Sequence, residues 1–154
     1  MFANVGINGG DRFWRTSAVL GAPFVWSVFY LLADSFSFQA PVQPSNWVVL
    51  VFLVPVLEEW VFRGWLFTRL HQAFATKLTI KFINQTLSVS IANAISSVLF
   101  CVLHLFSRDA ITAVVVFVPS IVLGGIREET NRVLPCMVTH VAWNMGFYLV
   151  LGLR

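Results

Sequence analysis

Three charged residues lie inside an otherwise apolar stretch, residues 55–67, with the sequence PVLEEWVFRGWLF. A charged side chain at the centre of a membrane helix costs roughly 2.5–3.5 kcal/mol on insertion scales, so such residues usually pair or form a site. Glu59 and Arg63 are four residues apart, so they share one helical face and can form an ion pair. Glu58 points about 100° away from Glu59. We expect Glu58 to have partners on other helices, to be protonated or to contact water. Pro55 predicts a kink beside it.

Polar residues in two other apolar segments are the candidate partners of Glu58. His104 ends the sequence FCVLH, and His140 and Asn144 lie four residues apart in HVAWN, on one helical face. Taken singly, an intramembrane histidine is often only a hydrogen-bonding group between helices, and we assign His71 such a role. Taken together, these residues predict one site in the interior of a helix bundle.

The composition indicates that these segments lie in a membrane. The chain has 154 residues, 58% hydrophobic and 11% charged, whereas a soluble domain is typically about half apolar and about a quarter charged. The net charge is +3 and the basic residues are dispersed, which argues against a nucleic-acid partner. Cys101 and Cys136 fit no zinc motif, and we expect two free thiols.

Five apolar segments of about 20 residues, the length that crosses a bilayer, predict an all-α protein: a polytopic transmembrane helix bundle of about five spans. We expect one membrane-embedded domain, residues 1–154, in which residues 1–45 form an N-terminal lead and a retained anchor span. The stretch 71–84 is either an interfacial amphipathic helix or an ordinary loop. The predicted spans are residues 17–33, 47–69, 87–106, 110–126 and 135–153.

Basic residues in the loops predict the orientation of the chain. They concentrate on the N-terminal side of the predicted membrane, which should therefore be cytoplasmic. Arg108, in a turn, and Arg154, at the C-terminus, are placed on the other side. The residues on the N-terminal side are Arg12, Arg15, Arg69, Lys77, Lys81, Arg127 and Arg132.

The order and spacing of three motifs resemble those of a known family. The motifs are EEWVFR at residues 58–63, FCVLH at 100–104 and HVAWN at 140–144. In these residues the chain resembles the CPBP (CAAX protease and bacteriocin-processing, or Abi) family of intramembrane proteases, which includes type II CAAX prenyl endopeptidases. The resemblance covers roughly residues 46–154, the family-like catalytic core.

This resemblance implies hydrolysis of a peptide bond within the membrane by a glutamic peptidase. Glu58 would be the general base that activates a water, assisted by His104. His140 and Asn144 would stabilise the oxyanion, and Glu59 with Arg63 would support the site. We expect no cofactor; the alternative is a zinc ion held by Glu58, His104 and His140. On the predicted spans His104 is offset roughly 10 Å from Glu58, so the third span must start later or the helices must tilt for the site to assemble.

The resemblance also implies the partners: the lipid bilayer and a peptide or protein substrate, which would be a C-terminal sorting tail, a leader or a CAAX-like peptide. By analogy with small relatives we expect a multi-pass protein of a prokaryotic inner or plasma membrane. A non-catalytic immunity or scaffold protein of the same fold is an alternative. A transporter or proton relay is another, although no internal repeat favours it. The oligomeric state is left open.

Overall fold

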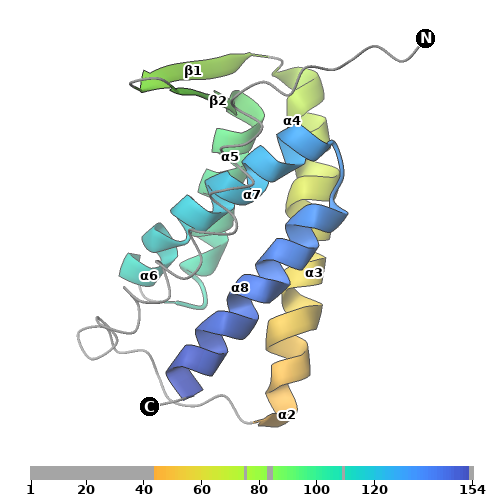
Figure 1. Cartoon of the computed structure of the whole chain (residues 1–154), viewed down its shortest axis with the longest axis vertical. Helices are drawn as coiled ribbons and strands as arrows, with labels where there is room; N and C mark the ends of the chain where they lie inside the picture. Colours follow the sequence, from red (N-terminus) through yellow and green to blue (C-terminus); the bar gives the residue numbers. More distant parts are fainter. Residues whose placement is uncertain (1–43, 75, 83–84, 109, 153–154) are drawn as a thin grey trace.

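The structure is a computed structural model that describes residues 44–74, 76–82, 85–108 and 110–152. These residues are mostly helical, and their helices pack side by side (Figure 1). The predicted first span, residues 17–33, and the arginines of the N-terminal lead lie outside the described residues. The predicted helix bundle is thus present in the described part, and the count of about five spans stays a prediction.

The segment that carries the first motif is one continuous helical run in which two stretches are π-helical. Pro55 lies in the first turn of the α-helix that follows the first π-helical stretch, where the N–H of Val54 donates to the carbonyl of Val49. The change from π-helical to α-helical winding at this point accommodates Pro55, which has no N–H to donate. The elements are α2 (Pro44–Trp47), η1 (Val48–Leu53), α3 (Val54–Glu59), η2 (Trp60–Leu66) and α4 (Phe67–Ala73).

A β-hairpin follows α4, and this contradicts both predictions for residues 71–84. Strands β1 (Lys77–Phe82) and β2 (Gln85–Ser90) pair antiparallel. The physical reason lies in the sequences KLTIKF and QTLSVS, which alternate polar and apolar residues as strands do. The all-α prediction is therefore wrong for this part of the described chain.

Helix α5 (Ile91–His104) starts later than the predicted third span, whose first four residues belong to strand β2. Ser90 has extended backbone angles and caps the helix, because its hydroxyl accepts a hydrogen bond of 3.0 Å from the N–H of Asn93. A serine at this position satisfies a donor that would otherwise have no partner at the helix start. A later start of the third span is one of the two conditions under which His104 can lie near Glu58, and tilting of the helices is the other.

The remaining predicted spans correspond to helices α6 (Ala110–Val115), α7 (Phe117–Thr130) and α8 (Leu134–Gly152). Ala110–Thr130 is the one helical stretch among the described residues that meets the length and apolarity needed to cross a membrane, with a mean hydropathy of 2.0. Asn131 ends α7 in the left-handed conformation at φ 52°, a common helix stop.

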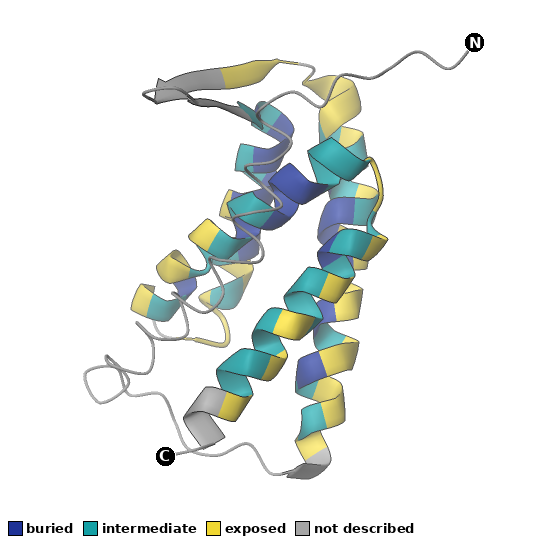
Figure 2. Cartoon of the chain, in the orientation of Figure 1, coloured by how far each residue is buried: buried dark blue, intermediate teal, exposed yellow. Residues whose placement is uncertain are grey.

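Buried residues gather where α5, α7 and η2 meet, and the outer faces of the helices carry exposed apolar side chains (Figure 2). Trp60 is 63% exposed and Val114 is 66% exposed. Exposed apolar side chains on many turns of these helices are typical of a protein that contacts lipid. Both cysteines are free as predicted, with Cys101 partly and Cys136 fully buried.

Small and polar residues fill the contact between α5 and α7. The Asn93 amide donates to the carbonyl of Ile121 over 3.1 Å, and its oxygen accepts a bond of 3.2 Å from the Ser97 hydroxyl. Asn93 lies directly against Gly124 of α7. Small residues that let two backbones approach, together with polar groups that bond across helices, are typical of membrane helix packing.

We expect Gly124→Ala to destabilise the protein by about 1–3 kcal/mol, the usual cost of overpacking a tight interior. The added Cβ would lie 1.8 Å from the Asn93 side-chain oxygen. Gly64→Ala is the matched control, because its Cβ would meet no heavy atom closer than 3.8 Å. Thermal unfolding in detergent measures both variants. Equal unfolding temperatures for Gly124→Ala and wild type would contradict the close α5–α7 contact.

Candidate active site

The predicted ion pair between Glu59 and Arg63 is present in the structure. Arg63 Nη1 lies 3.1 Å from Glu59 Oε1, and the two side chains are 1% and 0% exposed. Their i, i+4 spacing across the start of η2 brings the groups together on one face. A charge buried this deeply needs such a partner, because desolvating it alone costs several kcal/mol.

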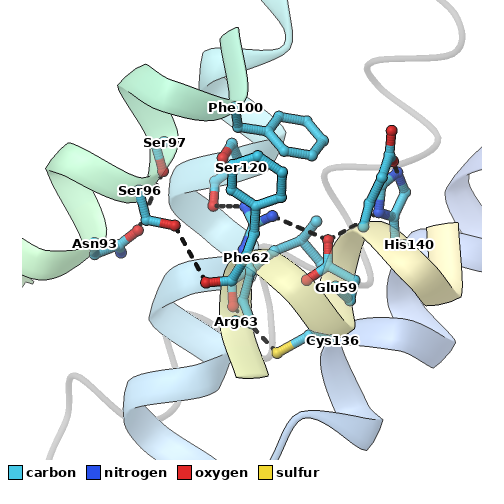
Figure 3. A network of polar contacts seen from close by, with 12 residues as sticks. Glu59, Phe62, Arg63, Asn93, Ser96, Ser97, Phe100, Ser120, Cys136 and His140 are labelled. Atoms are coloured by element: carbon cyan, nitrogen blue, oxygen red, sulfur yellow. Dashed lines mark hydrogen bonds and ion pairs between the residues drawn. The ribbon is translucent and has the colours of Figure 1, made fainter. Parts of the chain in front are cut away.

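The second terminal nitrogen of the Arg63 guanidinium contacts another helix. Its Nη2 donates to both the carbonyl and the hydroxyl of Ser120 on α7, over 2.9 and 2.6 Å (Figure 3). The guanidinium also lies 4.9 Å from the centre of the Phe100 ring on α5, within the range of a cation–π contact. Arg63 therefore joins three helices at the point where the motifs meet.

His140 of α8 lies between the two glutamates. Its Nδ1 is 2.9 Å from Glu59 Oε1, and its Nε2 is 3.8 Å from Glu58 Oε2. The sequence predicted that His140 approaches Glu58 in a shared site, and the structure shows that Glu59 is its closer partner. When Nδ1 donates to Glu59, the ring is held with Nε2 toward Glu58.

Glu58 is the more accessible of the two carboxylates. Its side chain is 26% exposed, whereas that of Glu59 is completely buried. His104 and His140 both lie close enough to Glu58 to interact with its charge. His104 Nδ1 is 2.9 Å from the Phe100 carbonyl, which fixes the ring on α5. The structure thus places His140 beside Glu58, and His104 within the range at which its charge acts on the same carboxylate.

Asn144 lies one turn further along α8 than His140 and contacts a different part of the first helical run. Its amide donates to the carbonyl of Leu50 in η1 over 3.2 Å. In this structure Asn144 therefore ties α8 to η1.

A comparison with protein-family models identifies the chain. The model described as type II CAAX prenyl endopeptidase Rce1-like matches residues 40–146, which include all three motifs. The chain belongs to the Rce1-like family. Its members are proteases embedded in a membrane, so membership makes this chain a membrane-embedded hydrolase of the CAAX endopeptidase class. Searches of curated proteins and of solved structures gave no match.

The donors of this Rce1-like site do not form a ready metal centre. Within the described ranges, no group of three or more His, Cys, Asp and Glu side chains is arranged to hold a metal ion. Nδ1 of His104 contacts a backbone carbonyl, and Nδ1 of His140 contacts Glu59. Zinc-binding histidines make such contacts through the nitrogen that does not bind the metal, so the zinc alternative would use the Nε2 atom of each ring.

Sequence reasoning missed one residue of the Rce1-like site. Ser120 holds Arg63 through two hydrogen bonds, yet it belongs to none of the three motifs. It is a polar residue within the apolar sequence FVPSIVLGG. Polar groups at membrane depth need partners, and this argument singles out the histidines in the sequence. The same argument applies to Ser120 and predicts that it has a partner on another helix.

Proposed function

We propose that this protein is a glutamic intramembrane endopeptidase in which Glu58 activates a water for attack on a peptide bond. The observation that supports this role best is the contrast between the two neighbouring glutamates. Glu59 is completely buried and bound to Arg63 and His140, whereas Glu58 is partly exposed beside two histidines. A general base must reach both water and substrate, and Glu58 alone of this pair meets that condition.

The reaction proceeds in two steps. Glu58 takes a proton from water as the water oxygen bonds to the substrate carbonyl carbon, which gives a tetrahedral oxyanion. Glu58 then returns the proton to the amide nitrogen as the carbon–nitrogen bond breaks. His104 orients the water, and His140 in its doubly protonated form donates from Nε2 to the oxyanion while Nδ1 keeps its bond to Glu59. A carboxylate of this kind acts as base and then as acid, and donors aimed at a developing charge supply much of the rate.

Asn144 is the second donor to the oxyanion in this proposal. A primary amide carries two N–H donors, so Asn144 can keep its bond to the Leu50 carbonyl and also donate to the substrate. The bond to Leu50 would then hold the amide in place. Glu59 and Arg63 act as positioning residues, because they set the orientation of His140.

The proposed substrate is a peptide presented by the membrane, with a CAAX-like C-terminal tail as the first choice because of the family. The test uses protein purified in lipid nanodiscs and three peptides: a prenylated CAAX-like peptide, its unprenylated form and a leader peptide. Mass spectrometry identifies the products. We expect cleavage of at least one peptide by wild type and none by Glu58→Gln. Cleavage of none, under conditions where the protein is folded, would favour a scaffold or immunity role instead.

We expect activity without a metal. Chelator treatment should leave the cleavage rate within about twofold of the untreated rate, because the base is a carboxylate that needs no metal-bound water. Elemental analysis of the purified protein should give zinc well below one ion per chain. Zinc at one ion per chain, with activity lost on chelation and restored by zinc, would establish the zinc alternative at Glu58, His104 and His140.

We propose that the protein crosses a prokaryotic plasma membrane several times with its N-terminus in the cytoplasm. Helix α4, strand β1 and the C-terminal end of α7 lie at the hairpin end of the helices (Figure 1), and these segments with the turn after α7 carry five basic residues, whereas Arg108 follows α5 at the opposite end. This bias supports a cytoplasmic position for the hairpin end. The five are Arg69, Lys77, Lys81, Arg127 and Arg132.

A further inference from the structure

Helix α7 carries none of the three motifs, yet one of its side chains is connected to the proposed catalytic groups. Ser120 is completely buried near the start of α7. Arg63 Nη2 donates to its hydroxyl over 2.6 Å and to its carbonyl over 2.9 Å. Figure 3 shows the guanidinium between Ser120 and Glu59, with a contact to each. Arg63 is therefore held by α7 as well as by the carboxylate on its own helical run.

The guanidinium passes the position of Ser120 on to Glu59. Its plane is rigid, so a partner that fixes Nη2 also fixes the direction in which Nη1 points. Nη1 lies 3.1 Å from Glu59 Oε1. The Phe100 ring packs against the guanidinium, 4.9 Å from its carbon. The position of the guanidinium over this ring depends on its two polar partners, Glu59 and Ser120.

Glu59 in turn holds His140. The oxygen that accepts from Arg63 Nη1, Oε1, is also the one that lies 2.9 Å from His140 Nδ1. The other ring nitrogen, Nε2, lies 3.8 Å from Glu58 Oε2. A series of polar contacts thus leads from α7 to the proposed base. Because a packed interior has low compressibility, a displacement at one end of this series is transmitted toward the other end.

We propose that Ser120 is a positioning residue, whose hydroxyl sets the place of His140 through Arg63 and Glu59. A group that donates to a developing oxyanion must be placed accurately, and an error of 1 Å can cost about 100-fold in rate. Ser120 touches no reacting atom, so its whole effect is on the placement of His140. The expected effect on rate rests on the function proposed above, whereas the expected effect on the geometry of His140 does not.

Cleavage kinetics in nanodiscs test the effect on rate. Ser120→Ala removes the hydroxyl and keeps the contact between the Ser120 carbonyl and Arg63. We expect kcat to fall by about tenfold and KM to stay within about twofold, because the change displaces His140 by less than 1 Å. Ser120→Thr keeps a hydroxyl and should restore most of kcat. If its extra methyl group prevents folding, Ser120→Cys replaces it and should give an intermediate kcat, because a thiol is a weak acceptor.

Ser97→Ala is the matched control. Ser97 is also completely buried, and its hydroxyl donates to Asn93 Oδ1 over 3.2 Å within α5. Both alanine variants delete one buried hydroxyl, so both should lower the unfolding temperature to a similar extent. Only Ser120→Ala should lower kcat. Equal losses of kcat in the two variants would mean a general loosening of the helices and would overturn the proposal.

Nuclear magnetic resonance of ¹⁵N-histidine-labelled protein reports on His140 without any cleavage. The signal of His140 Nδ1 is identified by its loss in His140→Gln. We expect Ser120→Ala to shift this signal and to speed exchange of its proton, because the hydrogen bond to Glu59 is loosened. The signal of His71, which stacks on Phe67 in α4, should not change. Ser97→Ala should leave both signals as in wild type.

The two measurements separate this inference from the proposed function. If wild type cleaves a peptide while Ser120→Ala keeps the wild-type kcat and His140 signal, the inference is overturned and the role of Glu58 stands. If wild type cleaves no peptide, the proposed function fails, and the His140 signal alone decides the inference. A shifted signal in Ser120→Ala would then support it, and an unchanged signal would overturn it.

Discussion

Glu58→Gln is expected to lower kcat for peptide hydrolysis by about 10²–10⁴-fold, the usual contribution of a general base. The amide has nearly the same shape as the carboxylate but cannot take a proton from water. The Glu58 side chain is 26% exposed, so its replacement should leave no buried charge without a partner. We therefore expect the variant to unfold at nearly the wild-type temperature. The measurement is the single-turnover cleavage rate of the best peptide in nanodiscs.

Glu59→Gln is the neighbouring control, and its expected effect is of a different kind. Glu59 accepts from both Arg63 and His140, so its loss should lower stability and loosen His140. Suppose instead that Glu59→Gln stopped hydrolysis in a fully stable protein while Glu58→Gln did not. The roles proposed for the two glutamates would then have to be exchanged.

Arg63→Met is expected to destabilise the protein by about 3–5 kcal/mol, because it leaves the completely buried Glu59 without its cation. It also removes both hydrogen bonds to Ser120 and the contact with the Phe100 ring. Arg63→Lys should not restore stability, since an ammonium lacks the planar fork that reaches Glu59 and Ser120 together. Thermal or denaturant unfolding in mild detergent measures the loss.

The double variant Glu59→Gln/Arg63→Met tests the cause of this loss. Removing a whole buried ion pair is often close to neutral, whereas removing one partner is costly. We expect the double variant to regain part of the stability that Arg63→Met loses. A single variant as stable as wild type would show that the pair is not needed to hold α7 against η2. A double variant less stable than either single variant would show that the cost does not come from an unpaired charge.

Local spacing predicted the parts of the site that lie within one helix. The i, i+4 relation gave the Glu59–Arg63 pair, because the pitch of a helix fixes which side chains meet. It could not give the contact between His140 and Glu59, which lie 81 positions apart in the chain. That contact depends on how α8 is rotated against α3. Helix rotation is set by packing, including small residues such as Gly124, and no motif records it.

The hairpin was missed for a related reason. The apolar residues from position 87 onward predict a continuous helix. The alternation of polar and apolar residues in each strand covers only six residues, and so short an alternation is a weak signal for a strand. The apolar pattern therefore places residues 87–90 in the third span, whereas in the structure they pair with residues 77–80. Once Ser90 is recognised as the helix cap, α5 begins at Ile91 and His104 comes within range of Glu58.

The most direct test of the account compares membranes from cells that make wild type or Glu58→Gln at equal levels. Mass spectrometry would identify the termini of membrane proteins and peptides in both. We predict that a set of termini present with wild type is absent with Glu58→Gln, and those cut sites would define the substrate. Identical termini in the two membranes, together with a growth or processing defect on deletion of the gene, would contradict catalysis through Glu58.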